Sequence, residues 1–348
     1  MVERGVEPGL GRAGGRDEAE PTPVGPRLAS GRAASGTAQF LLRYGIVLAL
    51  LVLGGFFAVQ SDVFLTTNNL TQILLQASIN TIVALGMTFV IITAGIDLSV
   101  GSTAALAGLI AAATMKTGVP LLGWEVPWGV AILLGVLVGV IVGLVNGLLI
   151  TTLRITPFIV TLGTLSVVRG LALIYSEGRP VFGFPPRFTS ALAGNLGPIP
   201  MPVVIAAVLA FLSWLVLRVT RLGEYAYAIG GNEEASRLSG VSVDRYKVAL
   251  YTLCGGFAAL AGVVLTARLR VAEPNAATGY ELDAIAATVM GGTSLFGGEG
   301  GVVGTIIGAL IIATLRNGLV LLNVQAYYQQ LAIGLVIILA VALDRFRQ

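Results

Sequence analysis

Long apolar stretches recur along the chain from about residue 41 to the C-terminus, separated by short polar or glycine- and proline-containing breaks. A helix of roughly 20 apolar residues crosses the ~30 Å hydrocarbon core of a bilayer. The pattern therefore predicts an all-α fold, a polytopic transmembrane helical bundle of about ten spans. The expected spans are 42–60, 70–93, 98–116, 128–152, 156–176, 200–219, 246–268, 281–293, 301–322 and 327–343.

The eighth apolar stretch, 281–293, is too short for a full crossing and runs into "GGTSLFGGEGG" at 291–301. So many glycines do not continue a helix. We expect a broken helix here, whose irregular backbone is buried in protein rather than exposed to lipid.

Two groups of spans, 2–5 and 7–10, share an order of features. Each group has an acidic residue near a helix start, then a run of spaced glycines, then an Asn-Gly pair at 146–147 or 317–318. A shift of five spans reverses the direction of crossing, so the two groups are predicted to form an inverted repeat.

Glycines recur at every fourth position on one face of span 4, which predicts close approach of a neighbouring helix: Gly135, Gly139, Gly143 and Gly147.

Composition supports a membrane protein and narrows its chemistry. The chain is 55% hydrophobic and 11% charged, with no histidine and one cysteine, Cys254. These features exclude histidine-based metal sites and an intrachain disulfide, and the net charge of +3 does not indicate nucleic-acid binding. No nucleophile–base pair or metal-ligand cluster is present, so we predict no catalytic residue, no metal and no cofactor.

The arginines and lysines favour an orientation with both termini in the cytosol, by about two to one. Residues 1–40 are rich in glycine, proline, alanine and arginine without periodicity, and are predicted to be a disordered cytosolic tail. Residues 41–348 are predicted to be the transmembrane domain, with one long cytosolic loop at 220–246. The protein is expected in the cytoplasmic membrane of a prokaryote as a multi-pass protein.

Asp97 in "AGIDLSVGS" is a lone carboxylate between two apolar runs. With the N-terminus inside, it is predicted to lie at the cytosolic edge, at the start of span 3. Its simplest role is to cap the helix by accepting hydrogen bonds from the backbone N–H groups of Ser99 or Val100. A gate, or a contact to a leaving substrate, is the alternative.

Polar side chains inside the spans are candidates to line a path for a hydroxyl-rich solute, or else to bond a neighbouring helix backbone. Intramembrane arginines at 169 and 316 are expected to pair with Asp97, Glu281, Asp283 or Glu299, or to reach the membrane surface. The path candidates are Thr93, Asp97, Ser99, Asn146, Thr161, Thr164 and Asn317, with Asn80, Thr81, Thr88 and Ser102 as further polar positions.

The loop 220–246 contains the signals of a short helix. Asn232 is a good N-cap, Glu233 and Glu234 fall in the first turn, Arg237 lies near the far end, and Gly240 is a C-terminal stop. A polar helix this short is not stable alone, which predicts a docking partner.

From about residue 40 onward the chain resembles the membrane permease subunits of ABC importers for simple sugars of the ribose, xylose and arabinose type. The resemblance rests on "GIDLSVGS", "VNGLLITTLRITPFIVTLGTLSVVRGLALI", "YAIGGNEEASRLSGVSVDRYK", "GYELDAIAATVMGGTSLFGGEGGVVGTIIGALI" and "LRNGLVLL", in that order. It implies that the short loop helix is a coupling helix contacting an ATPase subunit. The implied contact residues are Gly231, Asn232, Glu233, Glu234, Ala235, Ser236 and Gly240.

The resemblance also implies the partners: an ABC ATPase subunit, an extracytoplasmic sugar-binding protein and a second permease copy in a homodimer. No GxxxxGK[ST] phosphate loop occurs, so ATP hydrolysis is expected in the separate subunit. A nucleoside, polyol or furanose signalling molecule is an alternative substrate. An ion-coupled secondary transporter is the alternative from another class.

Overall fold

The computed structural model describes residues 36–116, 118 and 126–347. The chain from Arg43 onward is one compact unit, and the description that follows concerns this unit. Of the predicted tail, residues 1–35 lie outside the described part, and the first helix begins at Gly36. The main helices are α1 (Gly36–Gln60), α2 (Thr67–Ile92), α3 (Val100–Lys116), α4 (Trp128–Thr152), α5 (Pro157–Ser176), α7 (Met201–Val219), α10 (Val243–Leu269), α11 (Tyr280–Met290), α12 (Val302–Leu321) and α13 (Ala326–Arg347).

The structure is a helical bundle, as the hydropathy pattern predicts, and each of the ten expected spans falls on one of these helices. By length and composition, six described helices are able to cross a membrane: α2, α4, α5, α7, α10 and α12. Short elements not expected from the sequence lie between α5 and α10. They are α6 (Pro186–Ala193), a small hairpin of β1 (Asn195–Leu196) and β2 (Ile199–Pro200), and α8 (Arg221–Gly231), which precedes the expected loop helix α9 (Glu233–Leu238).

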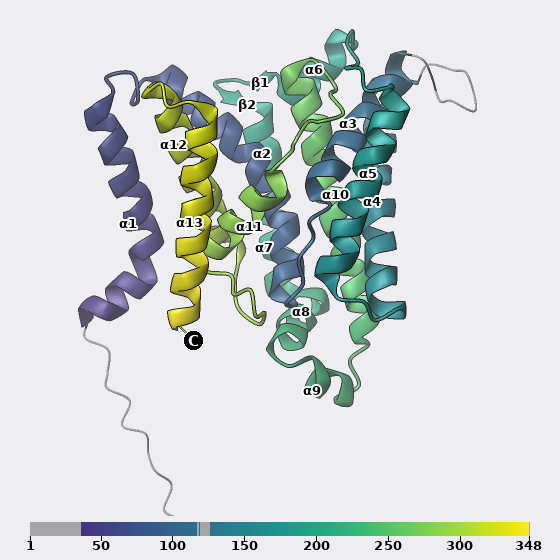
Figure 1. The fold of residues 1–348 in the computed structure, drawn as a ribbon, viewed down its shortest axis with the longest axis vertical. Coiled ribbons are helices and arrows are strands. Elements are labelled where there is room, and N and C mark those ends of the chain that lie inside the picture. The colour runs from purple at the N-terminus through teal and green to yellow at the C-terminus, as the bar shows by residue number, and fades with distance from the viewer. Residues whose placement is uncertain (1–35, 117, 119–125, 348) are drawn as a thin grey trace, which may run out of the picture. The chain divides into compact units, whose positions relative to one another are not determined.

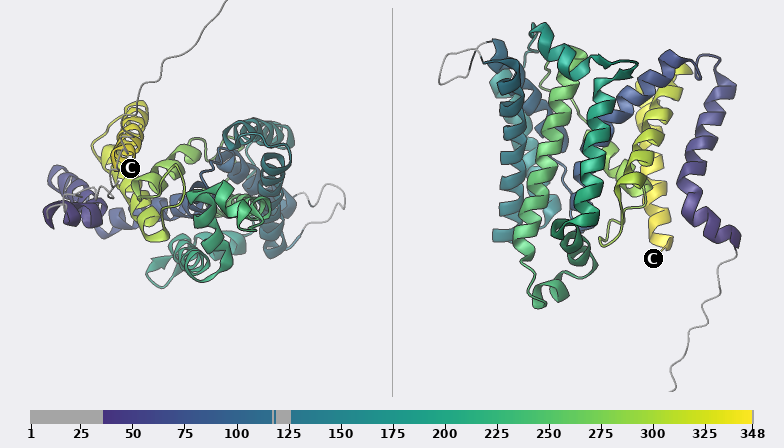
Figure 2. Two further views of the ribbon diagram at one scale, coloured as in Figure 1. Left: turned by 90° about the horizontal axis from the view of Figure 1, so that it is seen from below. Right: turned by 180° about the vertical axis from the view of Figure 1, so that it is seen from behind.

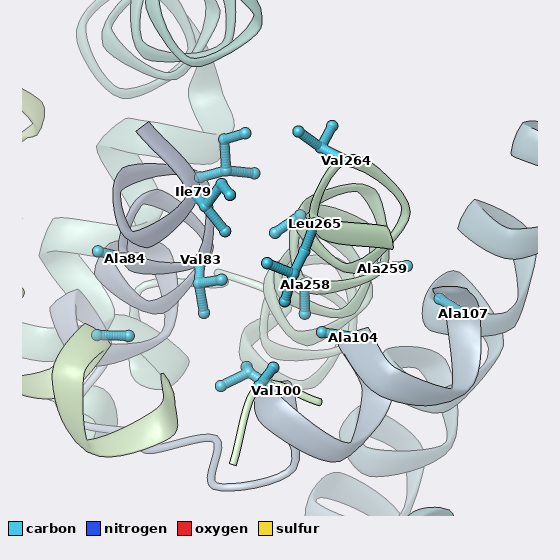
Figure 3. Packing of buried hydrophobic residues seen from close by; sticks show 14 of the residues in the cluster. Ile79, Val83, Ala84, Val100, Ala104, Ala107, Ala258, Ala259, Val264 and Leu265 are labelled. Atoms are coloured by element: carbon cyan, nitrogen blue, oxygen red, sulfur yellow. The ribbon is translucent and has the colours of Figure 1, made fainter. Parts of the chain in front are cut away.

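The long helices run side by side (Figure 1), with α6 and the hairpin at one end and α8 and α9 at the other, here called the α6 end and the α9 end. Helix α10 lies at the centre and packs against α2, α3 and α4. Small and branched apolar residues fill the space between these helices: Ile79 and Val83 of α2 face Ala258 and Leu265 of α10 (Figure 3). The core is therefore built on α10.

The helix pairs repeat in a regular way. Helix α10 packs against α3 and α4, and α2 packs in the same way against α11 and α12. Helix α3 also packs against α4 and α5, while α11 packs against α12 and α13. Helix α2 runs from the α6 end to the α9 end and α10 runs the opposite way (Figure 1). This is the packing that the predicted inverted repeat of spans 2–5 and 7–10 requires.

The glycines of α4 lie against α10, as predicted. A Cβ atom on Gly139 would overlap the carbonyl oxygen of Gly255, and one on Gly143 would overlap that of Tyr251. Gly255 in turn faces the backbone of Gly139. The two helix backbones are therefore in direct contact, which side chains would prevent.

Two connections inside the bundle are irregular. Helix α2 ends at Ile92, and an extended stretch then rises from the α9 end to the start of α3 (Figure 1). Helix α11 has only 11 residues and ends at Met290. The glycine-rich segment 291–301 that follows is not helical, and four of its glycines have positive φ, which confirms the predicted helix break.

The outer faces of α4, α5 and α7 are apolar and exposed. Exposed large side chains on these helices include Leu133, Phe158, Ile159, Val167 and Phe211. In water such a surface would be unfavourable, whereas hydrocarbon is its natural surrounding. The exposed apolar faces thus agree with a multi-pass membrane protein.

Candidate functional site

The loop helix α9 has the cap that the sequence predicts. Asn232 is its N-cap and its side chain accepts a hydrogen bond from the backbone N–H of Ala235 at 2.9 Å. Glu233 and Glu234 lie in the first turn, where the helix dipole favours carboxylates. Gly240 follows the helix with φ +87°, a conformation that glycine adopts without strain. Helix α9 extends beyond the other elements at its end of the bundle (Figure 2).

An ion-pair network fixes α9 to the first turns of α10. Arg237 donates to Asp244 at 2.8 Å and to Glu233 at 3.4 Å, and Lys247 donates to Glu233 at 2.6 Å. The hydrogen bond to Asp244 raises the pKa of the Arg237 guanidinium above its usual value, so this group stays charged at any physiological pH. A pocket of about 450 Å³ opens beside the network, with Arg154 of the α4–α5 turn on its wall.

The residues implied as ATPase contacts are exposed with one exception. Ser236 is 7% exposed and donates to the carbonyl oxygen of Asn232, so it holds the helix instead of presenting a surface. Leu238, in contrast, is 84% exposed at the end of α9. The sequence does not identify Leu238 as a contact residue, because the hydropathy of a leucine does not show whether a short helix buries or exposes it. The exposed predicted contacts are Gly231, Asn232, Glu233, Glu234, Ala235 and Gly240.

A second group of predicted residues forms a buried polar network between α3, α4 and α5. Asp97 accepts from the backbone N–H of Ser99 at 2.9 Å and from the Ser99 hydroxyl at 2.6 Å. The amide of Asn146 donates to the Ser99 hydroxyl at 3.0 Å, and Thr164 donates to the Asn146 side-chain oxygen at 2.7 Å. Thr161 donates to the carbonyl oxygen of residue 96 at 3.3 Å. Five of the seven path candidates thus lie together.

The predicted position of Asp97 at the edge of the bundle is wrong, although its predicted bond to Ser99 is confirmed. Asp97 is 1% exposed. Its network partner Asn146 lies six residues before the end of α4 at Thr152, about 9 Å inside the α9 end at 1.5 Å per residue. The reason is the extended stretch after α2, which carries Asp97 back into the bundle before α3 begins at Val100.

The two other path candidates lie apart from this network. Thr93 follows the last turn of α2 and donates to the carbonyl oxygen of Val90. Asn317 forms a pair of amide hydrogen bonds with Asn69, at 2.8 and 3.0 Å, which joins α12 to the first turn of α2. The Thr93 bond closes the end of α2, and the Asn317 bonds join α12 to α2, so both residues make bonds that support the fold.

One of the two intramembrane arginines, Arg316, forms a predicted carboxylate pair, and Arg169 forms hydrogen bonds that the sequence does not predict. Arg316 forms an ion pair with Asp283 at 2.8 Å. Arg169 instead donates to the backbone carbonyl oxygens of Pro274 and Ala276, at 2.5 and 3.0 Å, in the turns that connect α10 to α11. The described residues contain no group of three potential ligands that could hold a metal ion.

The fold and these sites define a class: a polytopic helical membrane protein with a short, capped polar helix projecting at one end. A family model described as the branched-chain amino acid transport system / permease component matches residues 69–341. The chain belongs to this family of transport permeases.

Curated relatives match nearly the whole chain. The ribose import permease protein of Escherichia coli is 46% identical over 318 residues, which cover 90% of this chain and 96% of that protein. The ribose import permease protein of Bacillus subtilis is 47% identical over 307 residues, 87% of this chain and 92% of that protein. The D-allose transport system permease protein of Escherichia coli is 42% identical over 309 residues, 88% of this chain and 93% of that protein. No solved structure matches the chain.

Proposed function

We propose that this protein is the permease subunit of an ABC importer that carries a monosaccharide across the cytoplasmic membrane of a prokaryote. The observation that carries the proposal is the 46% identity to a ribose import permease over nearly the full length of both chains. Relatives named for allose and galactose transport, at 42% and 37% identity, support a class of aldose sugars rather than ribose alone.

In this proposal α9 is the coupling helix and both termini lie in the cytosol. ATP binding closes the ATPase pair, and the coupling helices of two permease copies carry that movement into the bundle. An extracytoplasmic binding protein delivers the sugar at the α6 end. The cap at Asn232 and the ion pairs of Arg237 and Lys247 make α9 rigid, as an element that transmits force must be.

The polar network around Asp97 is proposed as part of the sugar path near the cytosolic side. A neutral, hydroxyl-rich substrate requires hydrogen-bonding side chains and no charged cage. Ser99, Asn146 and Thr164 supply hydroxyl and amide groups that are able to exchange their mutual hydrogen bonds for bonds to a sugar.

The docking role of α9 is tested with Leu238→Asp. A carboxylate in place of this exposed leucine would be desolvated in an apolar cleft of the partner, so the affinity for the ATPase subunit should fall about tenfold or more. The measurement is co-purification of the ATPase subunit with the tagged permease in detergent.

The matched control is Leu196→Asp, because Leu196 is also exposed but lies in the hairpin at the α6 end. It should retain the ATPase subunit. Equal co-purification of the ATPase with both variants would contradict the docking role of α9.

A further inference from the structure

The two irregular connections of the bundle meet at one point. The first is the segment 93–99 between α2 and α3, and the second is the glycine-rich loop 291–301 between α11 and α12. The backbone N–H of Gly298 donates to the carbonyl oxygen of Ile92, the last residue of α2, at 2.9 Å. A Cβ atom on Gly297 would approach the backbone nitrogen of Ala94 within 2.9 Å. The two helix breaks are therefore in backbone contact.

Helix α8 packs against this meeting point. A Cβ atom on Gly230 would overlap both the carbonyl oxygen of Ile92 and the backbone nitrogen of Gly298, so the last turn of α8 touches both breaks with its bare backbone. One turn earlier, the hydroxyl of Tyr227 donates to the carbonyl oxygen of Gly300 at 2.9 Å. Burial raises the pKa of Tyr227, which keeps this hydroxyl protonated as a donor.

An apolar cluster supports the same contact. Ala226 of α8 packs in a cluster with Phe89 and Ile92 of α2 and with Val302, the first residue of α12. Packed interiors have little free volume, so a displacement of one element moves its neighbours instead of being absorbed. Helix α8 is joined to α9 by the single residue Asn232.

The segment 93–99 connects the contact with α8 to the polar network around Asp97. Asp97 lies five residues after Ile92, and between them Gly95 packs against the hydroxyl of Tyr251 on α10. A movement of α8 therefore reaches Asp97 through a short stretch of extended chain. It also reaches the start of α12 through the glycine-rich loop.

We propose that Tyr227 and Gly230 are positioning residues that transmit the movement of α9 to the segment 93–99 and to the glycine-rich loop 291–301. The inference rests on the proposed function, in which an ATPase subunit moves α9. The loop 291–301 then acts as a mechanical connection that couples both helix breaks to the ATPase, in addition to being a break in the helix.

The test is Tyr227→Phe, which removes one hydroxyl and keeps the ring. The permease is reconstituted in proteoliposomes with its ATPase subunit and sugar-binding protein, and labelled ribose is the probe. The quantity measured is ribose imported per ATP hydrolysed by the co-purified complex, so that the amount of complex cancels from the ratio. We expect this ratio to fall about fivefold, the factor that one hydrogen bond is worth. Basal ATP hydrolysis should stay at the wild-type rate.

The matched control is Tyr225→Phe, because Tyr225 lies on the same helix and its ring packs against Tyr246 instead of the glycine-rich loop. Its ratio should equal that of the wild type. A wild-type ratio in Tyr227→Phe would overturn the inference, as would a failure of Tyr227→Phe to assemble, since the hydroxyl is assigned to transmission and not to folding. Absence of ATP-dependent uptake in the wild type would instead contradict the proposed function.

Discussion

Asp97 accepts two hydrogen bonds from Ser99, and Ser99 in turn is bonded to a distant helix. Ser99, two residues along the chain, supplies a backbone and a side-chain donor to the carboxylate. Asn146 of α4, which is 47 residues from Ser99, donates to the Ser99 hydroxyl. Local geometry thus accounts for the bonds between Ser99 and Asp97, and the tertiary fold adds the bond from Asn146 of α4 to Ser99.

The two hydrogen bonds from Ser99 lead to a prediction for Asp97. In Asp97→Asn the side-chain oxygen still accepts from Ser99, whereas Asp97→Ala leaves two buried donors without a partner, at about 1–3 kcal/mol each. We expect near-normal membrane levels and reduced uptake for the asparagine variant. The alanine variant should lose most of the folded protein, measured as monodisperse permease in detergent.

Equal and complete loss of uptake in both variants, at normal protein levels, would show that the carboxylate itself acts as a gate. The hydrogen bonds that Asp97 accepts from Ser99 would then be secondary to that role.

Much of this residue-scale description was predictable. The bond from Asp97 to Ser99 and the cap at Asn232 depend on neighbours within three residues, and such contacts follow from residue type and spacing. The depth of Asp97 in the bundle was not predictable. The apolar and small residues on both sides of it are compatible with a following helix that starts at the membrane edge, and equally with one that starts inside the bundle. The contacts of Gly230 with Ile92 and Gly298 join distant segments and leave no local pattern.

At the scale of elements, the packing of α4 on α10 depends on missing side chains. Gly135, Gly139, Gly143 and Gly147 all face the backbone or side chains of neighbouring helices. Their spacing in the sequence was sufficient to predict a close contact, but not its partner. The partner is α10, whose own Gly255 completes the contact from the other side.

Gly139→Ala is therefore expected to destabilise the protein. The added methyl group overlaps the carbonyl oxygen of Gly255, and the helices must separate, at a cost of about 1–3 kcal/mol. The measurement is the melting temperature of the purified permease in detergent. Gly129→Ala in the same helix is the control, because no atom lies within 4 Å of its added Cβ. Equal melting temperatures for the two variants would argue against a direct backbone contact.

Hydropathy predicts where the long apolar helices lie along the chain. It does not predict the short elements between them. The sequence predicts a loop where α8 lies, because "RLGEYAYAIGG" mixes polar residues and glycines over 11 positions. Its helical form depends on packing against α2 and α10, which local propensity does not report. Helix α9 was found because its cap and stop residues mark both ends.

At the scale of the whole molecule, one connected series of contacts links the two ends of the proposed mechanism. Helix α9 projects toward the proposed ATPase, α8 rests on both helix breaks, and the segment after α2 carries the polar network into the bundle. The repeated pairing of α2 with α12 and of α10 with α4 gives the bundle two similar halves that could rock against each other. ATP-driven alternating access is the account that uses all of these features.

The most direct test of that account is uptake of labelled ribose into proteoliposomes. We predict uptake only when the permease is combined with its ATPase subunit, its sugar-binding protein and ATP. The permease alone, with a proton or sodium gradient imposed across the membrane, should import none. Gradient-driven uptake by the permease alone would contradict the account and identify an ion-coupled secondary transporter.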